Sequence, residues 1–162
     1  MAGSVRLQPE AFDVAAETER LTRGRTDVGA VVAFTGICRG SEDGQPIAAL
    51  TLEHYPQMAE AEIARHVEEA ERRWPLLGVT VIHRYGRITP GEGIVLVLTA
   101  SSHRQDAFAA AEFLMDYLKT RAPFWKQVEQ AEIALGLRAV PDLAVSRGRD
   151  VVGMGTGRHR KI

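Results

Sequence analysis

The feature that most constrains the fold is an apolar run, VGAVVAFTGIC, at residues 28–38. The run is rich in β-branched and aromatic residues, and it lacks the polar–apolar alternation of a half-exposed strand. It therefore predicts a strand that is buried on both faces. The chain then passes Arg39 and a polar segment containing Gly and Pro, and the next apolar stretch, IAALTLEHY, predicts a strand returning antiparallel to the first.

Two amphipathic helices are predicted among these strands. After Pro56, apolar residues recur at steps of four, three and four, which is the spacing of one buried helix face. A second helix is expected to open at Ser102 with Gln105 in a capping-box pattern and to end near Arg121, since Pro123 cannot continue it. Its core stripe is predicted at Ala107, Ala111, Leu114 and Leu118. Strands and helices follow one another without regular alternation, which favours an α+β fold.

Length, charge and cysteine content exclude several classes of protein. The 162 residues suit a single compact unit, and a net charge of −1 argues against a protein that wraps nucleic acid. One cysteine, Cys38, permits neither an internal disulfide nor a multi-cysteine metal site. The sequence shows no signal-peptide pattern and no apolar stretch long enough for a membrane helix, so a cytoplasmic protein is expected.

The common catalytic motifs are missing from this sequence. The five histidines are scattered without the spacing of a helical zinc site, so we predict no metal, and no G-x-S-x-G motif marks a serine hydrolase. Cys38 is a conceivable nucleophile beside Arg39, although a lone cysteine in an apolar strand more often acts as a small hydrophobic residue.

Cations gather instead at the ends of the predicted elements. His103 and Arg104 fall at a helix N-terminus, where free backbone N–H groups favour an anion such as phosphate, although solvated cations also tolerate the position. Lys119 stands in the last helical turn, where a cation complements the helix dipole without any ligand. Lys126 follows two aromatic residues, and an ammonium group in such surroundings is a candidate general base or nucleophile.

Helix geometry separates these cations. His103 and Lys119 are sixteen residues apart, or about 24 Å along one helix, which no small metabolite spans. If both helix ends serve one substrate, the simplest arrangement is a two-fold dimer in which the His103 end of one subunit meets the Lys119 end of the other. We therefore predict a site shared between two subunits.

Five segments resemble the large, catalytic subunit of molybdopterin synthase over about residues 28–127. They occur in the order VGAVVAFTGICRG, LEHYPQMAE, VIHRYGRITPGE, SSHRQDAF and MDYLKTRAPFWK. The resemblance implies an α/β-hammerhead-type α+β fold with a mostly antiparallel sheet and flanking helices. It also implies a homodimer that binds two small ubiquitin-like sulfur-carrier subunits to form a heterotetramer.

The same resemblance implies the reaction. Family members use the C-terminal thiocarboxylate of the carrier to convert cyclic pyranopterin monophosphate, precursor Z, into the dithiolene of molybdopterin, with no cofactor of their own. Lys119 and Lys126 match the catalytic lysines of the family. The substrate-binding positions are expected to be both lysines together with Ile37, Cys38, Arg39, His103, Arg104, Gln127 and Val128.

The chain also departs from its relatives. They usually carry valine at the position of Cys38, so Cys38 is not expected to be essential. They also carry a basic residue followed by glutamate at Gln127 and Val128, and the loss of the cation at position 127 is expected either to weaken one phosphate contact or to alter the channel for the carrier. We expect residues 1–135 to form the domain and residues 136–162 a mobile, Gly- and Arg-rich tail. The alternative function is a non-catalytic dimeric module that binds anions or nucleotides through the same cations.

Overall fold

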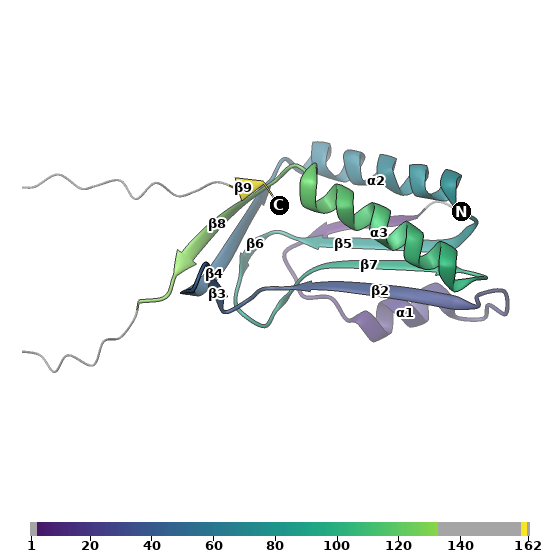
Figure 1. Cartoon of the computed structure of the whole chain (residues 1–162), viewed down its shortest axis with the longest axis horizontal. Helices are drawn as coiled ribbons and strands as arrows, with labels where there is room; N and C mark the ends of the chain where they lie inside the picture. The colour runs from purple at the N-terminus through teal and green to yellow at the C-terminus, as the bar shows by residue number, and fades with distance from the viewer. Residues whose placement is uncertain (1–2, 133–159, 162) are drawn as a thin grey trace, which may run out of the picture.

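A computed structural model describes residues 3–132 and 160–161 of the chain, and it has an α+β fold as predicted (Figure 1). Three helices and nine strands are present in this part of the chain. In chain order they are β1 (Ser4–Gln8), α1 (Val14–Thr22), β2 (Ala30–Ile37), β3 (Ser41–Glu42), β4 (Gln45–His54), α2 (Pro56–Arg73), β5 (Leu76–Arg84), β6 (Gly86–Ile88), β7 (Gly93–Ser101), α3 (Arg104–Thr120), β8 (Phe124–Gln130) and β9 (Arg160–Lys161).

The larger core lies on a four-stranded sheet with the order β1-β5-β7-β2. Only the β1–β5 pairing is parallel, and the other strands are antiparallel. Helices α2 and α3 cover one face of this sheet and α1 covers the other (Figure 1). Ile63, Val67 and Leu114 from the two covering helices pack with Val81 and Val97 of the sheet. Both faces of β5 and β7 are therefore buried.

A second sheet lies beyond one end of the first, with the order β3-β4-β8-β9 and with β6 paired to β4 (Figure 1). Its strands pair antiparallel, and a small core of Cys38, Ile47, Leu50, Leu52 and Ile88 lies against it. The chain reaches this sheet from β5 through Gly86, whose φ of +83° favours glycine. The two sheets meet near the C-terminal end of α3.

Two predictions about the first apolar run are wrong. β2 is the edge strand of its sheet and is not buried on both faces, since Phe34 and Ile37 are 36% and 55% exposed. β4 does not return beside it, because β4 pairs with β8 and β6 in the second sheet, while β7 is the neighbour of β2. The apolar composition of a segment indicates that the strand is at least partly buried, but it does not identify the strand that pairs with it.

The helices follow their predicted faces, but α3 starts differently. Its buried residues include Ala107, Ala111, Leu114 and Leu118, which confirms the stripe. The capping box does not form, because Ser102 donates its hydroxyl to the carbonyl of Asp27, and His103 is the N-cap residue without a side-chain cap bond. Ser102 thus ties the start of the helix to the chain leading into β2.

The C-terminal tail lies mostly outside the described residues, so its mobility and the boundary at residue 135 stay predictions. Arg160 and Lys161 are described, and as β9 they pair with Lys126 and Trp125. No helix in the described part of the chain is long and apolar enough to cross a membrane.

Candidate functional site

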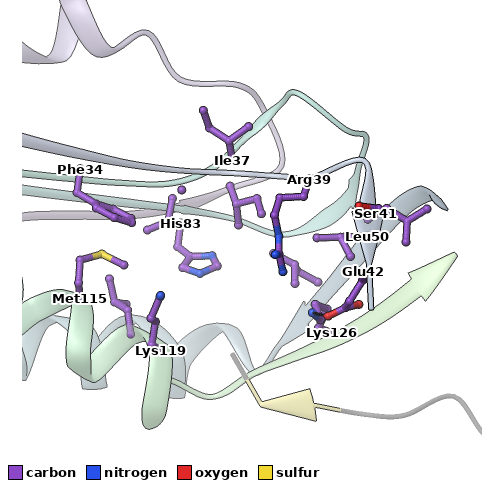
Figure 2. A pocket seen from close by; sticks show the side chains of 16 residues that line it. Phe34, Ile37, Arg39, Ser41, Glu42, Leu50, His83, Met115, Lys119 and Lys126 are labelled. Carbon is purple, nitrogen blue, oxygen red and sulfur yellow. Dashed lines mark hydrogen bonds and ion pairs between the residues drawn. The ribbon is translucent and has the colours of Figure 1, made fainter. Parts of the chain in front are cut away.

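A cavity of about 570 Å³ opens where the two sheets meet the end of α3 (Figure 2). This volume is in the range of small-molecule sites. Its walls come from β2, β3, β4, β5, β7, α3 and β8, which are far apart in sequence. The labelled lining side chains are Phe34, Ile37, Arg39, Ser41, Glu42, Leu50, His83, Met115, Lys119 and Lys126.

Three of the predicted cationic residues line this cavity together. Arg39 follows the end of β2, Lys119 lies in the last turn of α3, and Lys126 lies on β8. The two lysines come together because α3 ends at Thr120 and the chain reverses through Pro123 into β8. The cavity thus combines apolar walls with cations of the kind that bind oxyanions.

Lys126 already has a carboxylate partner. Its Nζ lies 2.5 Å from Oε1 of Glu42, and both side chains are 20% exposed. Glu42 is on β3 and was missed by the sequence analysis, because an acidic residue in a polar turn resembles a solvated side chain. The Asp43–Gly44 pair that follows it is a hairpin signal, which could have indicated that Glu42 is held in place.

His83 is the second residue that the sequence analysis missed. Its ring is 1% exposed, stacks on Phe124 at a centroid distance of 3.8 Å, and is directed into the cavity (Figure 2). Burial lowers the pKa of His83 to about 4, so the imidazole is neutral near pH 7. Because Nδ1 lies 2.8 Å from the carbonyl oxygen of Arg84, Nδ1–H is the donor and Nε2 is left as an acceptor.

Acidification is expected to destabilise the protein through His83. Between pH 6.5 and pH 4 the unfolded chain binds a proton at this histidine and the folded chain does not, so the free energy of unfolding falls as pH falls. The full loss is about 3 kcal/mol. Urea unfolding of the His83→Gln variant should show a correspondingly weaker pH dependence than that of the original chain. Equal acid sensitivity of His83→Gln and the original chain would contradict this expectation.

His103 and Arg104 do not join the cavity of a single chain. Both are exposed at the N-terminal end of α3, whereas Lys119 is at its other end. The length of α3 separates His103 and Arg104 from Lys119, as helix geometry predicts. His103 and Arg104 can therefore reach a cavity lined by Lys119 only if that cavity belongs to a second subunit. The shared site remains a prediction.

The other predicted substrate-binding residues divide into two groups. Ile37 lines the cavity, whereas Gln127 is exposed on β8 outside it and Val128 packs against the core of the second sheet. Cys38 is 2% exposed, and burial raises the pKa of its thiol. Its backbone N–H donates to Glu92 and its carbonyl accepts from Gly91. Cys38 therefore acts as a packing residue, which argues against a substrate contact there.

The absence of a metal stays a prediction. Within residues 3–132 and 160–161, no three histidine, cysteine or acidic side chains come together in a way that could hold a metal ion. The polar side chains that line the cavity are Arg39, Lys119, Lys126, the carboxylate of Glu42, the neutral imidazole of His83 and the hydroxyl of Ser41.

Comparison with known proteins gives a consistent result. The family described as MoaE protein matches residues 7–121. The molybdopterin synthase catalytic subunit of Mesorhizobium japonicum is 61% identical over 132 residues, covering 82% of this chain and 82% of the relative. The solved structure of a molybdopterin biosynthesis MoaE protein from Burkholderia ambifaria is 41% identical, with a TM-score of 0.71 over 82% of this chain and 92% of that one.

A solved two-subunit complex is also similar to this chain. The solved complex of subunits 1 and 2 of the molybdopterin-converting factor from Helicobacter pylori contains a chain with the same fold. The TM-score is 0.65 at 21% identity, over 80% of this chain and 91% of that one.

Proposed function

The chain belongs to the MoaE protein family of molybdopterin synthase catalytic subunits, and we propose that its sulfur transfer takes place in the cavity lined by Arg39, Lys119 and Lys126. The observation that carries this proposal is the convergence of these three cations from three separate elements. The reactants are both anions, since the carrier ends in a thiocarboxylate and precursor Z carries a cyclic phosphate. A cationic cavity favours bringing them together.

The roles of the residues follow from charge and atom balance. In each transfer a carbon–sulfur bond forms at a substrate carbon, and that carbon loses an oxygen substituent, either the phosphate oxygen as the cyclic phosphate opens or an oxygen released as water. Water then breaks the carbon–sulfur bond to the carrier, which is left with a C-terminal carboxylate. Protons must be moved as the cyclic phosphate opens, and Lys119 and Lys126 are the groups in the cavity suited to donate them. Arg39 supplies a fixed positive charge for the phosphate. Sulfur comes from the carrier, so the chain needs no cofactor of its own.

The assembly completes the site. We place a second copy of the chain so that its His103 and Arg104 reach the cavity, and the carrier so that its C-terminal end enters beside Lys126. The apolar edge at Phe34 and Ile37 is suited to being covered in such an assembly. We place the complex in the cytoplasm.

The alternative, a non-catalytic anion-binding dimer, uses the same cations but forms no carbon–sulfur bond. Incubation with thiocarboxylated carrier and precursor Z separates the two. The proposal expects molybdopterin to accumulate with repeated turnover, whereas the alternative expects binding of precursor Z that leaves it unchanged.

A further inference from the structure

Glu42 is the only acidic side chain among the described residues that line the cavity. Three cations share the cavity with it, so the lining keeps an excess of positive charge. Glu42 does not lie apart from these cations, because its carboxylate accepts a hydrogen bond from the ammonium of Lys126. Figure 2 shows the two side chains together at the end of the cavity formed by the second sheet.

The hairpin that carries Glu42 holds it in this position. Asp43 and Gly44 have φ angles of +50° and +76°, as a two-residue type I′ turn requires. Glu42 pairs with Gln45 across this turn, and Ser41 pairs with Pro46. The carboxylate is therefore presented by a short, defined hairpin that connects β3 directly to β4.

A carboxylate at this place opposes the function of the cavity unless it moves. It repels an incoming oxyanion, and it occupies the ammonium that the proposed function assigns to binding and proton transfer. A partly buried Lys126 ammonium without a hydrogen-bonding anion would raise the free energy of the unliganded protein. Pairing with the Glu42 carboxylate avoids this cost while no ligand is bound.

We propose that Glu42 is an internal substitute for the ligand's oxyanion: it pairs with Lys126 in the free subunit, is displaced when the oxyanion binds, and returns when product leaves. The proposal rests on the proposed function, because that function supplies the oxyanions. Two sources share this chemistry, namely the carboxyl end of the carrier and the phosphate of the substrate. After sulfur transfer the carrier ends in a carboxylate, so its release would exchange one carboxylate–ammonium pair for another.

The test compares Glu42→Gln with Asp43→Asn by titration with inorganic phosphate and with a peptide ending in Gly-Gly, which is the C-terminus that the family resemblance implies for the carrier. Both variants remove one negative charge from the same turn. Asp43 is exposed, forms no ion pair among the described residues, and asparagine tolerates its positive φ. Binding is followed by NMR at the side chain of Lys126, and the peptide with an amidated C-terminus controls for the carboxylate.

Glu42→Gln should bind at least one of the two probes about three- to tenfold more tightly than the original chain, as expected when a competing ion pair is removed. Asp43→Asn should bind both probes like the original chain. The probe that gains affinity identifies the source of the oxyanion, and a gain that persists with the amidated peptide would exclude its carboxylate.

Equal affinities of Glu42→Gln and Asp43→Asn would overturn the proposal. Weaker binding by Glu42→Gln would overturn it too, because Glu42 would then position Lys126 for the ligand and not compete with it. These titrations need no turnover. If the chain bound the probes as expected but made no molybdopterin, the proposed function would be contradicted. The proposal that Glu42 pairs with Lys126 in place of the oxyanion would still hold.

Discussion

Replacement of Lys119 by alanine is expected to lower dithiolene formation by at least about a hundredfold, because the cavity loses an ammonium that acts on charge developing in the reaction. The fold should be retained, since Lys119 is exposed on the last turn of α3 and its loss leaves no buried group unpaired. The rate is measured with purified carrier thiocarboxylate and precursor Z, and thermal unfolding confirms the folded state.

Arg121→Ala is the matched control for this variant. Arg121 is also an exposed cation at the end of α3, but it lines a separate hollow with Arg65 and Phe113. Its removal changes the net charge by the same amount and should leave the rate within about twofold. If Lys119→Ala retained the original rate, Lys119 would have no part in the chemistry.

Mixing two inactive variants is expected to restore activity. In a dimer of one His103→Ala subunit and one Lys119→Ala subunit, one of the two composite sites keeps both residues and the other has neither. Random exchange at equal concentrations makes half of the dimers mixed, so the recovered rate should be about a quarter of the original. Each variant alone should remain inactive.

Subunit exchange must be verified independently, by mass spectrometry of the intact dimers. Absence of recovery in a mixture that contains the mixed dimer would show that His103 and Lys119 act within one subunit or in separate sites. That result would remove the shared site, although it would leave the cavity at Lys119 and Lys126 in place.

Local sequence patterns predicted the helices, but they did not predict which distant strands pair with each other. The stripe on α3 repeats every three or four residues, so Leu114 and Leu118 could be assigned to the core from their spacing alone. The neighbour of β2 is β7, which lies more than fifty residues further along the chain. The apolar composition of residues 28–38 does not indicate which strand pairs with β2.

The site shows the same limit. The placement of cations at the ends of predicted elements and the resemblance to relatives both indicated Arg39, Lys119 and Lys126, which line one cavity in the fold. Glu42 and His83 remained hidden because their importance comes from what lies opposite them. Glu42 faces an ammonium 84 positions away, and His83 stacks on a ring from β8. Isolated charged or aromatic residues in a sequence do not show such partners.

The most direct test of the central claim is transfer of labelled sulfur. A carrier with an isotopically labelled thiocarboxylate is incubated with this chain and unlabelled precursor Z, and the product is analysed by mass spectrometry. We expect both dithiolene sulfurs of molybdopterin to carry the label, and we expect Lys119→Ala to prevent its transfer. Unlabelled sulfur in the product, or unchanged precursor Z beside an intact labelled carrier, would contradict sulfur transfer in this cavity.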